Sequence, residues 1–501
     1  MIAKIYPDGH PDLQGKKDPT HPVRYFDIRK LTPVECYSLM GVPPPQIATL
    51  MKTEKKPYMA WTGVDAQLAV FGLEPSATRR EVDEAYREAI ESLDNRQSDD
   101  DEEQTDDPDT QRIIAEEQEA DTEENALLRT NYDQAYQAII AAPQEQRYGD
   151  VQIISNSSHY KLAGNSIVCD VLMYIYEELL YPTGRRLPQE QPDLFALPQF
   201  RLTRDWKKEP LKLVTLCSGY DSQAIAMDML QKRYKDFRWR LMAWSEFDPE
   251  STRPLEEQPA VVAHNLLFPK YKNLNRGDMT KADWSDLADA EIDLLTYSTP
   301  CQSISQAGKR EGIKKGSGTR SAVLWSTEEA VRHMRPKVLL QENVRALINS
   351  VNMPDFKEWC KLLESHGYVN FLAPQFPIPW GTDKRDKRTV PGILNAKHYG
   401  VPQNRERVYM VSIRADLLNG SERVAGEYSP ATQYEFPRPF ALEKCIADVL
   451  EDNVDERFFL KPDSVIKFLT VNEATDAAQI HYVVTDHKLS DEEIAHARSS
   501  K

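Results

Sequence analysis

From Leu211 onward, short apolar runs that suit buried strands alternate with amphipathic segments that suit helices. This alternation favours an α/β fold with a doubly wound, mostly parallel sheet, because parallel strands need a crossover connection between them. Strands are predicted near residues 212–218, 240–246, 292–298, 337–342 and 407–414. Helices are predicted near residues 221–235, 321–334 and 354–367. Ligands of such sheets lie at the carboxyl ends of the strands, so the residues there are the candidates for chemistry.

The third of these strands leads directly to a cysteine. From Ile292 the chain reads Ile-Asp-Leu-Leu-Thr-Tyr-Ser-Thr-Pro-Cys-Gln. A strand here would deliver the thiol of Cys301 to the sheet edge, and Pro300 would restrict the backbone just before it. A lone free cysteine is more often a buried core residue, so the neighbouring strand ends must decide between the two interpretations.

The first two strands end in residues that suit a small cofactor. Residues 216–221, Leu-Cys-Ser-Gly-Tyr-Asp, form a tight turn into a helix, whose N-terminus can bind polar groups. The turn lacks the full glycine fingerprint of a dinucleotide site. Glu246 ends the second strand, where a carboxylate can bind ribose hydroxyls, and Asp278 in the following loop could accept from an adenine amino group. Each feature alone also suits a structural turn or a solvated acid.

Two later segments bring an acid and two cations to the same edge. Glu342 follows an apolar strand, and a thiol beside a protonatable carboxyl suits addition of sulfur to an electron-poor ring while the acid protonates the ring nitrogen. Arg405 and Arg407 stand at alternate positions at a strand start, which places both on one face. Guanidinium groups there can fork onto a carbonyl or phosphate. A surface ion pair is the alternative for the two arginines.

Together these motifs resemble the DNA cytosine-5 methyltransferases. They are Pro300-Cys-Gln302, Glu342-Asn-Val344 and Gln403-Asn-Arg-Glu-Arg407, in that order on the α/β pattern. The resemblance covers about residues 211–414 and implies a Rossmann-like, S-adenosylmethionine-dependent fold. It implies that Cys301 adds to carbon 6 of a cytosine flipped out of double-stranded DNA. Glu342 would contact the ring nitrogen, and S-adenosylmethionine would donate the methyl group to carbon 5.

The resemblance also assigns residues to the two parts of the site. The implied catalytic residues are Cys301, Gln302, Glu342, Asn343, Arg405 and Arg407. The implied cofactor-binding residues are Asn165, Ser166, Leu216, Cys217, Ser218, Gly219, Tyr220, Glu246, Phe247, Asp278, Met279 and Pro300.

The chain departs from the family pattern in two ways. The first turn normally reads Phe-x-Gly-x-Gly, whereas here it reads Cys217-Ser-Gly-Tyr-Asp221. The closing Gly-Asn-Ser motif normally comes near the C-terminus, whereas its match, Gly164-Asn-Ser166, precedes the first strand. The resemblance therefore implies a circular permutation, with new ends in or beside the target-recognition region, because exposed loops tolerate new termini.

This order divides the chain into four predicted regions. They are a permuted segment (1–55), a helical insertion (56–150), a catalytic domain (151–420) with its closing helix (164–180) placed first, and the start of a target-recognition region (421–501). Little sequence is left for reading DNA, so either the recognition region is small or a second chain completes it.

Charge is concentrated in the insertion. Residues 99–124 carry 14 acidic side chains and one basic, Arg112, against a net charge of −17 for all 501 residues. The stretch is predicted to be a disordered, self-repelling loop, and the nearly balanced remainder does not exclude DNA. The flanking helices weakly resemble a J-domain but lack its His-Pro-Asp loop, so chaperone stimulation is not expected.

Composition adds the cellular setting. No apolar run is long enough to span a bilayer, the first residues lack a signal-peptide core, and six cysteines form no CxxC pair. A cytoplasmic protein with no metal site and no membrane partner is expected. The leading hypothesis is a bacterial or phage DNA methyltransferase serving restriction-modification or self-marking. The alternatives are an RNA (tRNA) cytosine methyltransferase and a non-catalytic DNA- or cofactor-binding homologue that needs a partner chain.

Overall fold

The computed structural model describes residues 2–6, 25–73, 75–97, 108–181, 198–300, 320–381, 387–418, 422–424, 427–429, 432–459 and 483–485. They form two compact units. The larger comprises residues 33–50 and 160–450, and the smaller comprises residues 1–32, 51–159 and 451–501. The chain therefore leaves the larger unit after its first short segment and returns to it at residue 160.

The larger unit is built on a seven-stranded sheet. Its strands are β5 (Leu211–Leu216), β6 (Trp239–Ser245), β7 (Leu294–Tyr297), β8 (Val338–Val344), β9 (Tyr368–Leu372), β10 (Ile393–Asn395) and β11 (Glu406–Arg414). The order is β10-β11-β8-β7-β5-β6, and β9 also pairs with β11. Strands β6, β5, β7 and β8 are parallel to one another. Strand β11 runs antiparallel to β8, β9 and β10. The predicted α/β class is confirmed, with β9 and β10 as additions.

Strand order locates the binding edge. Strand β6 lies on one side of β5 and β7 lies on the other, so the winding direction reverses between β5 and β7. Open α/β sheets bind ligands at such a switch point, beyond the carboxyl ends of the strands. The turn after β5 and the segment after β7, which leads toward Cys301, meet at this point.

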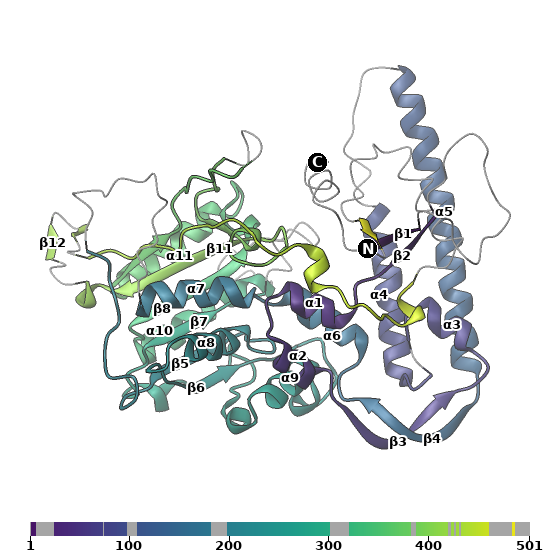
Figure 1. The fold of residues 1–501 in the computed structure, drawn as a ribbon, viewed down its shortest axis with the longest axis horizontal. Helices are drawn as coiled ribbons and strands as arrows, with labels where there is room; N and C mark the ends of the chain where they lie inside the picture. Colours follow the sequence, from purple (N-terminus) through teal and green to yellow (C-terminus); the bar gives the residue numbers. More distant parts are fainter. Residues whose placement is uncertain are drawn as a thin grey trace. The chain divides into compact units, whose positions relative to one another are not determined.

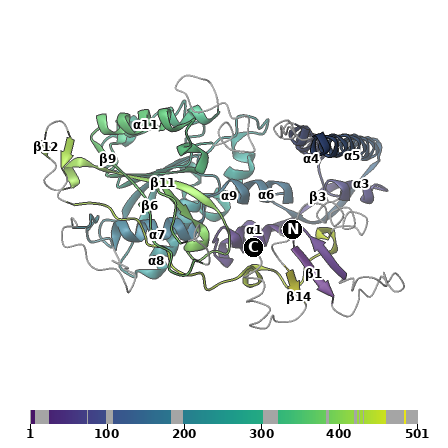
Figure 2. The ribbon, with the colours of Figure 1, turned by 90° about the horizontal axis from the view of Figure 1, so that it is seen from above.

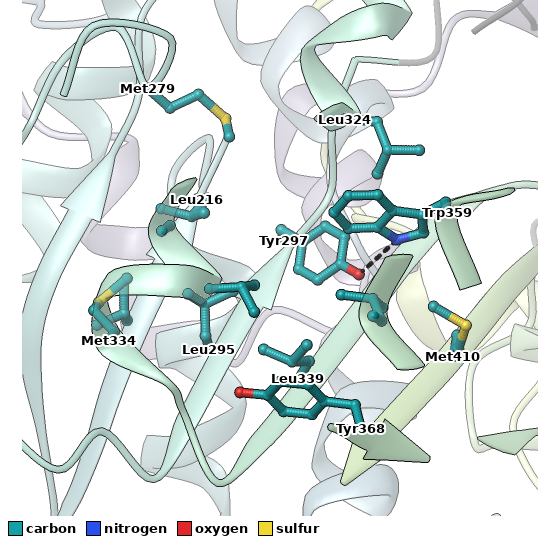
Figure 3. Packing of buried hydrophobic residues seen from close by; sticks show 14 of the residues in the cluster. Leu216, Met279, Leu295, Tyr297, Leu324, Met334, Leu339, Trp359, Tyr368 and Met410 are labelled. Carbon is teal, nitrogen blue, oxygen red and sulfur yellow. Dashed lines mark hydrogen bonds between the residues drawn. The ribbon is translucent and has the colours of Figure 1, made fainter. Parts of the chain in front are cut away.

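Helices cover both faces of the sheet. They are α7 (Cys169–Leu180), α8 (Ser222–Arg233), α9 (Pro259–Leu267), α10 (Thr327–Met334) and α11 (Met353–Ser365). Figure 2 shows α11 on one side of the sheet and α7 with α8 on the other. The first of these faces holds a core in which Leu295, Tyr297 and Trp359 pack together, and the Trp359 indole N–H donates to the Tyr297 hydroxyl at 3.1 Å (Figure 3).

The closing helix differs from its prediction at its start. Gly164 and Asn165 end a separate helix, α6 (Asn156–Asn165), and α7 begins only at Cys169. The apolar residues of this segment that are buried include Ile167, Val171, Leu172, Ile175 and Leu179. The break between the helices sets Ser166 in a non-helical position, where its backbone carbonyl is free to accept from outside the helix. Two short helices, α1 (Pro33–Leu39) and α2 (Pro44–Leu50), complete the packing near this segment.

The smaller unit contains the insertion. A two-stranded antiparallel ribbon, β3 (Thr53–Trp61) and β4 (Gln144–Gln152), brings its two ends together. Between them lie α3 (Asp65–Val70), α4 (Arg79–Gln97) and α5 (Pro108–Ala141), and Figures 1 and 2 show α4 and α5 side by side. The ribbon was not predicted, because its residues are mostly exposed and lack an apolar alternation.

The predicted disordered loop over residues 99–124 needs correction. Residues 108–124 continue α5, and residues 98–107 lie outside the described part. Glu, Ala and Gln are strong helix formers, and a helix already anchored by its packed C-terminal half extends at little cost. In residues 108–124, helix propensity therefore outweighs charge repulsion.

The remaining described segments are short. Strands β1 (Ile2–Tyr6), β2 (Tyr25–Arg29) and β14 (Val483–Thr485) form a small sheet. Strands β12 (Glu422–Val424) and β13 (Glu427–Ser429) pair separately. A single 3₁₀ turn covers Ile446–Val449. Among the described residues, no helix is long and apolar enough to cross a membrane, and no three His, Cys, Asp or Glu gather as a metal site.

Candidate active site

The turn after β5 has an unusual backbone. Cys217, Gly219 and Asp221 all have positive φ angles, of 51°, 59° and 70°. Such angles favour glycine, and Asp is among the few other residues that tolerate them. The turn exposes the Gly219 N–H, which donates to Glu246 Oε2 at 2.6 Å. The ends of β5 and β6 are therefore joined directly by this hydrogen bond.

Glu246 is the acid of this part of the site. Burial raises the pKa of its carboxyl to about 7, while the hydrogen bond from Gly219 acts in the opposite direction. Its backbone N–H donates to Asn275 Oδ1 at 3.2 Å, and the neighbouring Ser245 hydroxyl donates to the Gly277 carbonyl at 2.6 Å. These bonds hold the loop that carries Asp278 and Met279 against the end of β6.

The other predicted cofactor-binding residues differ in what their side chains contact. The Cys217 and Met279 sulfur atoms lie 3.3 Å apart, and burial raises the pKa of the Cys217 thiol. Ser218 is buried, and its hydroxyl has no hydrogen-bond partner among the described residues. Leu216 points into the core (Figure 3). Asp278 instead accepts from the Thr280 hydroxyl in its own loop, at 2.7 Å.

Two further predicted residues lie toward solvent. The Phe247 side chain is 38% exposed, and Asn165 is exposed at the end of α6. Their assignment to the cofactor site rests on sequence position.

The segment 164–166 contacts both the turn after β5 and Arg405, the residue just before β11. The Tyr220 hydroxyl donates to Ser166 Oγ at 2.7 Å. Arg405 Nη2 donates to the carbonyls of Gly164, at 2.8 Å, and Ser166, at 2.7 Å. Burial, followed by the neighbouring charge of Arg407, lowers the pKa of the Arg405 guanidinium. Residues that are more than two hundred positions apart in the sequence are thus joined directly.

The end of β8 carries the catalytic carboxylate predicted from sequence. Glu342 is 5% exposed. Its Oε2 accepts from the Ser298 hydroxyl at 2.5 Å, and its Oε1 lies 3.3 Å from Arg407 Nε. The next residue, Asn343, donates from Nδ2 to the Thr299 carbonyl at 3.1 Å. Strand β8 is therefore bonded side by side to the segment that leads through Pro300 to Cys301.

Cys301 and Gln302 lie outside the described residues. Arg405 and Arg407 were predicted to share one face, but their side chains take different partners, segment 164–166 and Glu342. Sequence reasoning missed Ser298, Thr299 and Asn275. The position of Ser298 and Thr299 directly before the Pro-Cys pair was the available signal.

The fold and the site together define a doubly wound α/β protein with an acidic, partly buried binding edge at its switch point. The chain belongs to the C-5 cytosine-specific DNA methylase family, whose sequence model matches residues 235–500.

Individual relatives match over shorter stretches. The type II methyltransferase M2.ScrFI of Lactococcus lactis subsp. cremoris is 37% identical over 193 residues, which are 38% of this chain and 44% of that protein. The orphan methyltransferase M.SssI of Spiroplasma monobiae is 42% identical over 170 residues, 33% of this chain and 38% of that one. The orphan methyltransferase M.SPRI of Bacillus phage SPR is 27% identical over 293 residues, 54% and 58% of the two chains. The chain spans about half the length of these relatives.

Solved structures give weaker likenesses. The Dnmt2 methyltransferase of S. pombe has a TM-score of 0.31 and 18% identity, covering 51% of this chain and 64% of that one. A DNMT2 mutant of Spodoptera frugiperda has a TM-score of 0.33, 18% identity and coverage of 52% and 65%.

Proposed function

We propose that this protein transfers a methyl group from S-adenosylmethionine to carbon 5 of cytosine in double-stranded DNA. The observation that carries the proposal is the bonding of Glu342. Ser298 and Arg407 hold this carboxylate at the edge that β7 leaves on its way to Cys301. A thiol nucleophile and an oriented acid are what addition to a cytosine ring requires.

The chemistry assigns each group a step. The Cys301 thiolate adds to carbon 6 while Glu342 delivers a proton to the ring nitrogen, which leaves carbon 5 nucleophilic. When bound, S-adenosylmethionine would supply its methyl group to carbon 5 and leave as S-adenosylhomocysteine, and the ring nitrogen would return its proton to Glu342. Loss of the carbon-5 proton to a base then expels the thiolate, which restores the ring double bond and frees the enzyme. The target cytosine must leave the helix for this to happen.

The residues present fit the cofactor. The half-buried Glu246 carboxylate suits ribose hydroxyls. The unpartnered Ser218 hydroxyl and the start of α8 offer polar groups to a charged amino-acid moiety. Asp278, Met279, Pro300 and Ser166 would line the rest of the site.

We further propose that the motif order is circularly permuted. In support, segment 164–166 bonds to the turn after β5 and to Arg405, and α7 packs against α8. These are the positions that a closing C-terminal helix would take beside the first strand. The recognition part would then lie among residues 1–24 and 462–501, or be completed by a second chain.

The direct test is methyl transfer from labelled S-adenosylmethionine to mixed-sequence duplex DNA, with the purified single chain and base-resolved mapping. Methylated cytosines at a defined motif are expected, in keeping with a role in restriction-modification or self-marking. A duplex that contains 5-fluorocytosine should trap the wild-type chain covalently but not Cys301→Ala. Transfer to tRNA alone would contradict the proposed acceptor, and absence of a trapped adduct would contradict the proposed mechanism.

A further inference from the structure

We infer that His264 is a positioning residue for the turn after β5, because it holds the Asp221 carboxylate and thereby a backbone shape that glycine would adopt unaided. The inference rests on the proposed function, in which this turn contributes to binding S-adenosylmethionine. It explains the departure of this chain from the family pattern, since Asp221 stands where the second glycine of the turn is normally found.

Asp221 occupies a backbone conformation that needs support. Its φ and ψ of 70° and 60° are left-handed, which costs most non-glycine residues free energy. Its side chain is fully buried and bonded at both oxygens. Oδ1 accepts from the Ala224 N–H at 3.0 Å and caps α8, and Oδ2 accepts from the Thr215 hydroxyl at 3.0 Å.

His264 comes from α9 and reaches the same carboxylate. Its Nε2 lies 3.3 Å from Asp221 Oδ2, and both side chains are completely buried. Neither ring nitrogen has a partner in hydrogen-bond geometry in the described part of the chain, so Asp221 Oδ2 is the charged group that Nε2 approaches without a formed hydrogen bond. The ring is stacked on Trp244, with centroids 3.6 Å apart, and the Trp244 indole N–H is itself fixed by the Tyr271 carbonyl at 2.9 Å.

The pairing has a consequence for the cofactor site. A buried carboxylate is costly unless polar groups surround it, so loss of the polar contact from His264 should shift Asp221 or the turn. The two residues before Asp221 make the contacts that shape the site, Tyr220 with Ser166 and Gly219 with Glu246. A shift of the turn would therefore weaken cofactor binding more than DNA binding.

The test is a double-mutant cycle read by calorimetric titration of the full chain with S-adenosylmethionine. His264→Phe keeps the ring stack on Trp244 but removes the polar contact, and it should raise Kd about tenfold, near the lower end of the cost of one left-handed residue. In an Asp221→Gly background the same change should alter Kd less than about twofold. His264→Gln, whose amide can donate to the carboxylate, should restore most of the affinity and covers the case in which His264→Phe fails to fold.

Phe268→Leu is the matched control, because Phe268 packs on the same ring without touching Asp221 through a polar atom. Its Kd should stay near the wild-type value. Wild-type affinity in His264→Phe, or an equal loss with and without Asp221, would overturn the inference while leaving the proposed function intact. A wild-type chain that binds no S-adenosylmethionine would instead refute the proposed function, and this role with it.

Discussion

Replacement of Ser298 by alanine tests whether the carboxylate of Glu342 is oriented for catalysis. The Ser298 hydroxyl donates to Glu342 Oε2 at 2.5 Å, and the carboxylate is 5% exposed, so water cannot simply take its place. A hydrogen bond to a charged group contributes about 1.5–3 kcal/mol. If that energy orients the acid only in the transition state, kcat should fall roughly 10- to 100-fold.

The assay is steady-state transfer of labelled methyl groups to duplex DNA, together with calorimetric binding of S-adenosylmethionine. Kd for the cofactor should remain within about twofold of the wild-type value, because the Ser298 hydroxyl bonds to Glu342 and is not among the proposed cofactor-binding residues. Ser412→Ala is the matched control. Its buried hydroxyl donates to Asn370 Oδ1 at 2.7 Å. Ser412 lies on the same sheet, three residues along β11 from Tyr409, which pairs with Glu342 across the two strands.

Equal kcat values for Ser298→Ala and Ser412→Ala would refute this reasoning. They would mean that the bond to Glu342 serves packing and does not prepare the acid for the reaction.

Four further outcomes are expected. Cys301→Ala should abolish transfer while cofactor binding persists; substantial residual transfer would identify a different nucleophile. Arg405→Ala should raise Kd for S-adenosylmethionine about tenfold, because segment 164–166 loses two hydrogen bonds, each of about 1 kcal/mol or more. An unchanged Kd would argue against a cofactor role for that segment. Glu246→Gln should stabilise the fold by about 1–2 kcal/mol at pH 8 but not at pH 4, as urea unfolding would measure. Because the pKa of Glu246 is raised in the folded state, the free energy of unfolding of the wild-type chain falls as pH rises from about 4.5 to 7. A stability difference between the two chains that does not change with pH would contradict this prediction. Residues 62–143 can be replaced by a short Gly-Ser turn at the closed end of the β3–β4 ribbon, and methyl transfer should remain intact. A variant that folds but is inactive would show that the insertion takes part in the reaction.

Local patterns explain which elements were predictable. Strands β5, β6, β7, β8 and β11 combine apolar runs with turn residues at their ends, and helix α11 carries amphipathic spacing, so each could be located within a few residues. The β3–β4 ribbon escaped because its strands are largely exposed, and β9 and β10 because they are short. The acidic part of α5 was not predicted to be helical, because the prediction for residues 99–124 rested on charge repulsion and not on helix propensity.

By itself, the sequence determined the winding of the sheet and the set of strand ends that carry Cys301, Glu342 and Glu246. Hydrophobic periodicity is a local property, and parallel strands bring their carboxyl ends to one edge whatever fills the loops. Only the tertiary structure decided which side chains meet at that edge. Arg405 bonds to Ser166 and His264 reaches Asp221 because strand order and helix packing join segments far apart in the chain, and no periodicity in the sequence records such pairings.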